Sequence, residues 1–313
     1  MAMASPLSHR DITRFHHHHH SHLISLLKHY GKTKSLSSGR ILHDFLLRST
    51  CFDHDQFLQN LLVDMYGSCG SLKEAQNIFD SLLHPNVYSW NVLLHGYGKH
   101  GSLADARSVF ERIPHPDVCS WNTLIKLVSQ HSCLDDTKFV FGMIPYRNVV
   151  SWNAMISAAV RPKDSFDDAF QFFIQMIVEG IQPDKFTFVS VIDACTGLLN
   201  LQMGKIIHVV VISAGCEQDL LVGTALVNMY GKCGQSSLAT VVFRTMPCPD
   251  DVAWTAMMAS FSHNDLGKEA LDVFYMMLHR GIKADVVTYV CALNACSSFG
   301  VVNEGKEIHS AVV

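Results

Sequence analysis

Side chains that could bind a metal or attack a substrate are plentiful in this 313-residue sequence, which holds 19 histidines and 10 cysteines. A zinc-dependent deaminase would require H-x-E and C-x-x-C motifs, because the metal needs an imidazole and two thiolates and the reaction needs a carboxylate. Neither motif occurs, and the G-x-S-x-G and P-loop motifs are absent as well. We therefore expect no enzyme, with no catalytic residue, no metal site and no cofactor.

Histidines and cysteines instead recur at long, regular intervals. His208 and His309 lie 101 residues apart, and so do Cys195 and Cys296. His43 has a sequence context similar to that of His208 and His309, so we expect these three to occupy one repeat position, too far apart to share a metal. We interpret the cysteines as small buried apolar residues in a reduced compartment.

Aspartates form a second group of chemically capable residues. Five of them lie just before predicted helices, namely Asp117, Asp184, Asp219, Asp250 and Asp285. An ionised aspartate accepts hydrogen bonds and donates none. Its ordinary task before a helix is to cap the free backbone N–H groups of the first turn. Taken one at a time, these residues are predicted to be helix caps.

The helices themselves are predicted from a tripeptide that organises the chain. Ser-Trp-Asn starts at residues 89, 120 and 151, and an altered copy, Ala-Trp-Thr, starts at residue 253. Apolar residues then recur at helical spacing, as in Trp90, Leu93 and Leu94. The 31-residue period indicates stacked supersecondary units rather than one globular core. We expect all four tryptophans in equivalent packed sites.

A second apolar segment follows each of these helices. Ala106, Val109 and Phe110 have helical spacing, and Pro114 then ends that helix. Neither helix can bury its apolar stripe alone, so neighbouring pairs must stack. The predicted fold class is all-α, a solenoid of stacked helix-turn-helix repeats with about eighteen helices.

Extending the period along the chain gives about nine repeats. The predicted boundaries are 20–55, 56–86, 87–117, 118–148, 149–184, 185–219, 220–250, 251–285 and 286–313, the last incomplete. A solenoid ordinarily ends in a polar cap, so the apolar end at residues 311–313 leads us to expect a fragment or truncated relative of a longer protein.

Residues 1–19 are predicted to be a leader outside the repeats. Arg10 and Arg14 against the single Asp11 suggest a transit peptide, and a disordered segment is the alternative. The five histidines at 16–20 fit a low-complexity leader or an added tag.

Composition limits the kinds of partner. Hydrophobic residues make up 48% of the chain, which suits a continuous core between two layers of helices. The 24 basic residues do not outnumber the 28 acidic ones, so the net charge of −4 argues against a purely electrostatic nucleic-acid binder. No apolar run reaches the roughly 18 residues that a membrane span needs.

Two patterns in combination resemble the pentatricopeptide repeat family: V-x-S-W-N-x-(M/L)-I in the first helix and G-x-x-x-x-A-x-x-x-F-x-x-(M/I)-P in the second. The mixed repeat lengths and the run from Asn228 to Gly234 are similar to the plant PLS subclass, without its C-terminal E and DYW regions. The resemblance covers residues 20–313, with departures at Ser132, Thr137 and 161–164. It implies a right-handed superhelical solenoid that binds single-stranded organellar RNA, one base per repeat.

The resemblance assigns base recognition to the fifth and the last residue of each repeat. The pairs are Asn60/Asn86, Asn91/Asp117, Asn122/Asn148, Asn153/Asp184, Val189/Asp219, Thr224/Asp250 and Thr255/Asp285. The second residue of each repeat is implied to flank the base as an apolar wedge: Phe57, Tyr88, Cys119, Val150, Phe186, Leu221, Val252 and Val287. Contact between neighbouring repeats would place apolar residues there equally well.

Hydrogen-bonding chemistry indicates which bases these pairs would accept. Aspartate suits uracil and guanine, which present an imino N–H, whereas asparagine can donate to cytosine or adenine. The family's code assigns asparagine at the fifth position to pyrimidines and threonine to purines. The implied target, from its 5′ end, is pyrimidine, U, pyrimidine, U, any base, G, G. The fifth base is left unspecified, because Val189 at that repeat has no polar side-chain atom.

We interpret the chain as an adaptor in organellar RNA processing, with C-to-U editing the favoured process and the mitochondrion favoured over the chloroplast. The expected partners are single-stranded organellar RNA and editing or processing factors in trans, with no membrane and no small-molecule substrate. The alternative is a protein–protein scaffold of tetratricopeptide-like helical repeats. Its W-x-x-L-G-x-x-Y pattern is absent, and it does not predict alternating repeat lengths.

Overall fold

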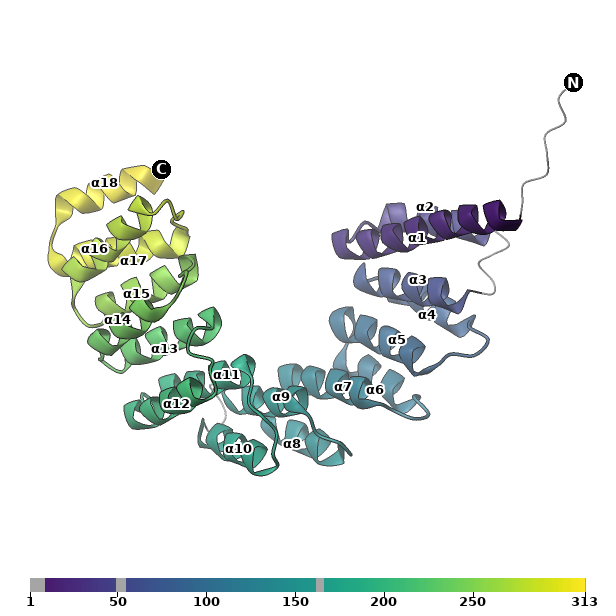
Figure 1. Cartoon of the computed structure of the whole chain (residues 1–313), viewed down its shortest axis with the longest axis horizontal. Helices are drawn as coiled ribbons and strands as arrows, with labels where there is room; N and C mark the ends of the chain where they lie inside the picture. The colour runs from purple at the N-terminus through teal and green to yellow at the C-terminus, as the bar shows by residue number, and fades with distance from the viewer. Residues whose placement is uncertain (1–8, 49–54, 162–165, 313) are drawn as a thin grey trace, which may run out of the picture. The chain divides into compact units, whose positions relative to one another are not determined.

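The computed structural model describes residues 9–48, 55–161 and 166–312 (Figure 1). Within these ranges the chain forms 18 helices and no strand, which confirms the predicted all-α fold class. The chain divides into two compact units, Met1–Ser132 and Cys133–Val313.

The first unit contains seven of the described helices. They are α1 (His9–Thr33), α2 (Leu36–Leu47), α3 (Gln56–Ser68), α4 (Leu72–Asp80), α5 (Val87–His100), α6 (Leu103–Glu111) and α7 (Val118–His131). Helix α3 packs against α1 and α5, and α5 packs against α7. Helices α4 and α6 lie on this row, each in contact with the odd-numbered helices before and after it.

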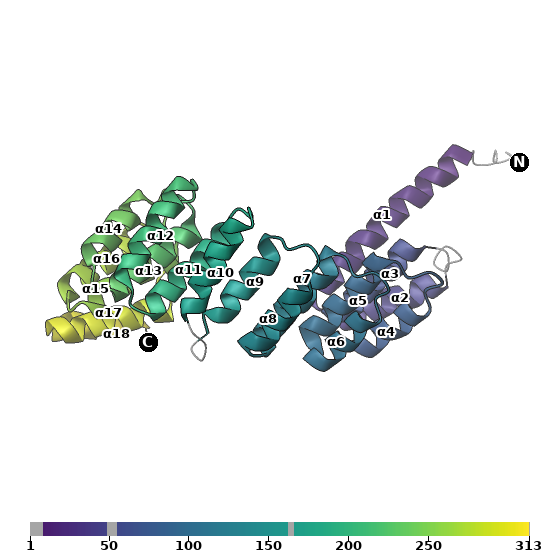
Figure 2. The same ribbon diagram turned by 90° about the horizontal axis from the view of Figure 1, so that it is seen from below.

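The second unit contains the other described helices, from α8 onward (Figures 1 and 2). They are α8 (Leu134–Met143), α9 (Val149–Ala159), α10 (Phe166–Val178), α11 (Lys185–Gly197), α12 (Leu201–Ser213), α13 (Leu220–Lys232), α14 (Ser236–Thr245), α15 (Asp251–His263), α16 (Gly267–His279), α17 (Val286–Phe299) and α18 (Val302–Val312). Odd-numbered helices again form a continuous row from α9 to α17, and each even-numbered helix contacts that row. Each unit is therefore a stack of helix pairs in two layers.

Most odd-numbered helices begin where an aspartate or asparagine supplies the cap. Asn86 accepts from the Ser89 N–H at 2.9 Å, and Asp117 accepts from the Ser120 N–H at 2.9 Å. Such caps satisfy backbone donors that have no partner within the helix. From α3 onward these helices start at the first residue of a segment delimited above. Helix α1 instead starts at His9, so residues 9–19, expected in a leader, lie within it, whereas residues 1–8 lie outside the described residues.

Aromatic pairs join many of the successive helix pairs. Trp90 packs edge-on against Phe79 with ring centroids 4.5 Å apart, and Trp152 packs against Phe141 at 4.6 Å. Equivalent contacts join Trp121 to Phe110 at 4.7 Å and Trp254 to Phe243 at 4.8 Å. In each case the tryptophan lies on an odd-numbered helix and the phenylalanine on the even-numbered helix before it. We call such a pair an aromatic joint.

The four tryptophans are not equally packed, contrary to the expectation of equivalent sites. Trp152 is fully buried, and Trp90 and Trp254 are nearly so, whereas Trp121 is only partly buried. The Arg112 guanidinium lies over the Trp90 ring at 5.2 Å and that of Arg280 over the Trp254 ring at 5.3 Å. Among the described residues no cation is recorded over Trp121 or Trp152, so the partial exposure of Trp121 does not follow from the lack of a covering cation.

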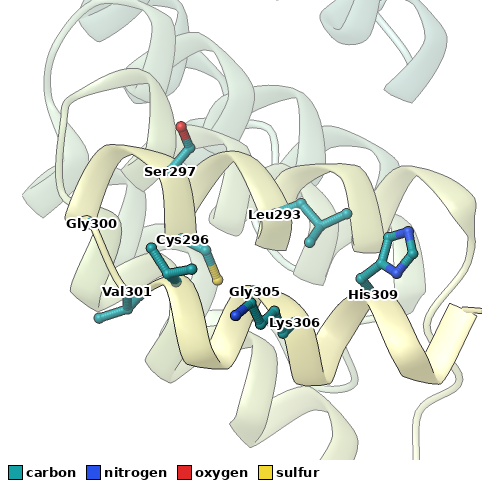
Figure 3. Close-up of a pocket in the computed structure, with 9 residues that line it drawn as sticks. Leu293, Cys296, Ser297, Gly300, Val301, Gly305, Lys306 and His309 are labelled. Carbon is teal, nitrogen blue, oxygen red and sulfur yellow. The ribbon is translucent and has the colours of Figure 1, made fainter.

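A different joint connects α2 to α3 and α12 to α13. At Gly204 an added Cβ would lie 2.6 Å from the Met229 Sδ, and one turn on His208 Nδ1 lies 2.9 Å from the Tyr230 hydroxyl. Gly39 with Met65, and His43 with Tyr66 at 3.0 Å, repeat this arrangement. We call it a glycine joint, because the methionine end occupies the space next to the glycine that a Cβ would fill. On α18 the corresponding residues, Gly305 and His309, line an open surface pocket together with α17 residues such as Leu293 and Cys296 (Figure 3).

The cysteines follow the prediction only in part. Cys195 and Cys296 are buried, and burial raises the pKa of the Cys195 thiol to about 12. Cys119, Cys133 and Cys248 are exposed instead. Among the described helices, none is both long and apolar enough to cross a bilayer.

Candidate functional site

The residues implied to contact bases gather at the start of the odd-numbered helices. Each last residue is the N-cap of the following odd-numbered helix, as Asp117 is for α7 and Asp184 for α11. Each fifth residue lies in the first or second turn, as Asn91 does in α5 and Asn153 in α9. The two members of an implied pair are therefore far apart in sequence, yet both lie near the N-termini of successive odd-numbered helices.

Asn91 and Asp117 form the first linked pair. The Asn91 Nδ2 donates to the Asp117 Oδ1 at 3.0 Å, and the Asn91 Oδ1 accepts from the Ser120 hydroxyl at 2.6 Å. The same aspartate oxygen accepts from the Ser120 N–H at 2.9 Å. Partial burial opposes ionisation of Asp117, but the hydrogen bonds from Ser120 and Asn91 outweigh it and hold its pKa below the usual value. This carboxylate is thus ionised at neutral pH.

The same arrangement recurs in the second unit. The Asn153 Nδ2 donates to the Asp184 Oδ1 at 2.9 Å, and the Thr187 hydroxyl donates to the Asn153 Oδ1 at 2.5 Å. A third version uses Thr255, whose Oγ1 lies 3.0 Å from that of Thr288. Thr288 in turn donates to the Asp285 Oδ1 at 2.7 Å.

Four implied pairs have neither a direct nor a hydroxyl-bridged hydrogen bond between their members among the described residues, and in two of them, Thr224/Asp250 and Val189/Asp219, the last residue is an aspartate. Asp250 caps α15 through the Ala253 N–H at 2.9 Å, and no recorded bond links it to Thr224. Asp219 caps α13, and its Oδ2 lies 3.4 Å from the Lys185 Nζ, while Val189 has no polar side-chain atom. Position 253 is alanine and position 222 is valine, so both pairs lack the bridging hydroxyl.

Asn60 differs from the other fifth residues. Its side chain is only 3% exposed, and its Oδ1 has no hydrogen-bond partner among the described residues. Asn86, the last residue of the same repeat, accepts from the Ser89 hydroxyl at 3.0 Å instead. Helices α1, α2 and α5 all pack against α3, which carries Asn60. Asn122 and Asn148 belong to different units, and Asn148 caps α9 through the Ser151 N–H at 3.0 Å.

The second residues all project outward. Those that are large and apolar are between 45% and 59% exposed: Phe57, Tyr88, Val150, Phe186, Leu221, Val252 and Val287. Cys119 is exposed too. Side chains that only joined neighbouring repeats would be buried between them, as Trp152 and Phe141 are. The aromatic members, Phe57, Tyr88 and Phe186, offer a flat face on which a base could stack, and the aliphatic ones offer apolar contact only.

Sequence reasoning missed the residue that links each pair. Ser120, Thr187 and Thr288 each lie three residues after the last residue of the preceding repeat, and each is fully buried. The signal was available, because Ser120 is the serine of the Ser-Trp-Asn tripeptide. Its role depended on a contact between two repeats, which the spacing alone did not reveal.

No other chemistry emerges at these positions. Within the described residues, no cluster of three or more histidine, cysteine, aspartate or glutamate side chains is placed to hold a metal ion. His43 and His208 each bond a tyrosine rather than another histidine. The site as described offers hydrogen-bond donors, acceptors and apolar surfaces.

The repeats of this chain are similar in sequence to repeats of known proteins. Residues 147–197 and 249–298 match a sequence model of the PPR repeat family, and residues 81–114 and 60–84 match two further PPR repeat models. A pentatricopeptide repeat-containing protein of Arabidopsis thaliana is 40% identical over 274 residues, which cover 88% of this chain and 35% of that protein. The chain spans about a third of the length of the curated relatives it matches.

Two further relatives from Arabidopsis thaliana have names that state a location. One, called mitochondrial, is 28% identical over 90% of this chain and 39% of its own length. Another, called chloroplastic, is 37% identical over 47% of this chain and 28% of its own. Among solved structures, the pentatricopeptide repeat protein PPR10 in complex with an 18-nt psaJ RNA element superposes with a TM-score of 0.71. It is 20% identical, with 87% of this chain and 42% of that chain covered, so the two share a fold.

Proposed function

We propose that this chain, which contains pentatricopeptide repeats and is homologous to pentatricopeptide repeat proteins, binds single-stranded RNA in a sequence-specific manner. The observation that carries the proposal is the hydrogen bond between an asparagine at the fifth position and the aspartate of the next helix cap, which recurs in both units beside an exposed apolar side chain. Asn91, Asp117 and Val118–Cys119 show it in one unit, and Asn153, Asp184 and Phe186 show it in the other. An isolated cap needs no such partner.

The free atoms of each linked pair match one edge of a base. In the Asn91/Asp117 pair the amide keeps one N–H and the carboxylate keeps Oδ2, since the other bonds are already made. Uracil presents a carbonyl oxygen beside its N3–H, which an N–H donor and a carboxylate acceptor complement. At the Thr255/Asp285 pair a hydroxyl replaces the amide, which the family's code assigns to the larger guanine; the hydroxyl donates to the Asp251 carbonyl oxygen at 2.8 Å, so the Asp285 carboxylate is the acceptor for the guanine imino N–H.

Exposed apolar side chains supply the second part of the binding surface. Stacking of a base on such a side chain contributes about 1–3 kcal/mol per base when the side chain is aromatic. The chain has few basic residues to neutralise phosphates, so stacking and base hydrogen bonds carry much of the affinity. The proposed target, 5′ to 3′, is pyrimidine, U, pyrimidine, U, any base, G, G. Among the positions with a polar fifth residue, the first is read least well, because Asn60 is buried.

The proposed role is that of an adaptor in organellar RNA processing, with C-to-U editing as the favoured process. Names that state a mitochondrial or a chloroplastic location among the relatives support an organelle and favour neither one. Editing or processing factors in trans would supply the catalysis.

The test is a competition between RNAs that contain 5′-UUUUAGG-3′ and 5′-UUUUAAA-3′ cores. Wild type should prefer the first core, and the D250N/D285N double variant should shift toward adenine by a factor corresponding to about 1–3 kcal/mol per base. D251N is the matched control, because Asp251 is an exposed carboxylate next to Asp250 outside the proposed pair. The log–log salt dependence of wild-type binding should be shallow, with a slope of about −2 to −4.

If wild type and D250N/D285N rank the two RNAs identically, Asp250 and Asp285 act only as helix caps and do not read bases. A salt slope near about −8 would show that phosphate contacts dominate the binding.

A further inference from the structure

The buried hydroxyls of Ser120, Thr187 and Thr288 stand at the centre of the linked pairs. All three side chains are fully buried, so a ligand bound at the surface has no access to them. Each nevertheless contacts both members of a pair: Ser120 Oγ lies 2.6 Å from the Asn91 Oδ1 and 3.0 Å from the Asp117 Oδ1. A group placed in this way can control what the pair presents without touching the ligand.

The carboxylate sets which way the amide of the fifth residue faces, and the hydroxyl holds the other side of that amide in place. An ionised carboxylate only accepts hydrogen bonds, so the Asn91 Nδ2, not its Oδ1, must face Asp117. The Asn91 Oδ1 then needs a donor on its other side, and the Ser120 hydroxyl is that donor. Thr187 serves Asn153 and Asp184 in the same way. Both amides are thereby held with one N–H directed away from these partners.

The chain contains natural comparisons in which this hydroxyl is absent or differently engaged. Ala253 occupies the position after Asp250, and no recorded hydrogen bond joins Thr224 to Asp250. Ser89 is as buried as Ser120, but its hydroxyl donates to Asn86 and has no recorded contact with Asn60. The link between a fifth and a last residue within one unit thus accompanies a hydroxyl that bridges the two.

We propose that Ser120, Thr187 and Thr288, each the third residue of its repeat, are positioning residues for base selection: each buried hydroxyl locks the fifth and last residues of the preceding repeat into the one orientation that discriminates between bases. The inference rests on the proposed RNA binding and deepens it. Ser120 sets discrimination at the base read by Asn91 and Asp117, and Thr187 does so for Asn153 and Asp184. Thr224 and Asp250 discriminate less well between bases, because Ala253 has no hydroxyl to hold them in one orientation.

The first experiment measures competition between RNAs that differ only at the second base of the proposed target, U against C. S120A should lower the preference for U by about three- to tenfold, the range expected for the loss of one or two oriented hydrogen bonds. Discrimination at the fourth base, read by Asn153 and Asp184, should stay unchanged. S120T should restore the wild-type ranking, since threonine occupies the same place at 187 and 288.

S89A is the matched control, because it removes an equally buried hydroxyl from the same tripeptide in the same unit. It should leave the U-over-C preference at the second base at the wild-type value. A253S tests the inference in the opposite direction, by adding a hydroxyl where none exists. It should increase G-over-A discrimination at the sixth base by a similar factor, and it does not depend on S120A remaining folded.

Two outcomes separate the inference from the function on which it rests. If wild type ranks the RNAs but S120A and A253S rank them as wild type does, the hydroxyls only cap helices and the inference is wrong. If wild type shows no base preference at all, the proposed function fails, and the inference fails with it. A loss of affinity in S120A that is equal for U and C also overturns the inference, because a purely structural defect would produce it.

Discussion

Aromatic joints and glycine joints connect successive helix pairs in opposite ways. At the aromatic joint between Phe141 and Trp152 the contact is made by bulk, and the indole is fully buried. At the glycine joint between α12 and α13 the contact is made by the lack of a side chain, since Gly204 leaves space for the Met229 thioether. A half-buried hydrogen bond between the Tyr230 hydroxyl and His208 Nδ1 completes that joint. An aromatic joint should lose stability when side-chain atoms are removed, whereas a glycine joint should lose stability when they are added.

The two kinds of joint also differ in how their stability should depend on pH. An aromatic joint contains no group that titrates near neutrality. In the glycine joint, burial lowers the pKa of His208 below its usual value, and His43 behaves in the same way despite the opposing effect of Asp44. Stability should therefore depend on pH through the glycine joints and not through the aromatic ones.

The largest effect is expected at the most buried aromatic joint. Trp152→Ala should lower the free energy of unfolding by about 3–5 kcal/mol, because it removes a fully enclosed aromatic side chain and leaves a cavity. Trp121→Ala should cost clearly less, since that ring is partly exposed. Urea denaturation followed by circular dichroism measures both. Equal losses would show that the exposure of Trp121 does not reflect its packing in solution.

A smaller loss is expected when the glycine joint is overfilled. Gly204→Ala should cost at most about 1 kcal/mol, because the new methyl group displaces the flexible end of Met229 while alanine favours the helix over glycine by about 0.5–1 kcal/mol. Met229→Ala in the same chain should recover part of that loss, which a double-mutant cycle measures as a favourable coupling. Gly142→Ala is the control, since a Cβ there meets nothing within 4 Å. Strictly additive losses at 204 and 229 would contradict the close contact.

The smallest effect is the pH dependence of the same joint. A histidine whose pKa is lowered by folding stabilises the folded state fully above its unfolded pKa of about 6.5, and that stability is lost as the pH falls below this value toward the folded pKa. His208→Gln should therefore flatten the decline of the melting temperature between about pH 7 and pH 5. Tyr230→Phe should lower stability by about 1 kcal/mol at neutral pH and keep the decline, because His208 stays buried. An unchanged decline in His208→Gln would assign the pH dependence to other groups.

Local pattern accounted for a large part of the fold. The Ser-Trp-Asn period and the caps at Asn86, Asp117 and Asn148 place helix starts correctly, because a cap and an apolar stripe act within one or two turns of chain. The same pattern did not anticipate that α1 begins at His9, where no period exists to guide a boundary.

The sequence by itself determined which residue types stand at the fifth and last positions of each repeat, since these follow from the period, and their assignment to base recognition stays a prediction from the resemblance. Only the tertiary structure decided how each pair is used. Burial of Asn60, partial exposure of Trp121 and the hydroxyl bridge from Ser120 to Asn91 all depend on which side chains a neighbouring helix presents. Residues 91 and 120 come together only when two repeats stack, and a buried hydroxyl takes its partners from that contact rather than from its neighbours in sequence.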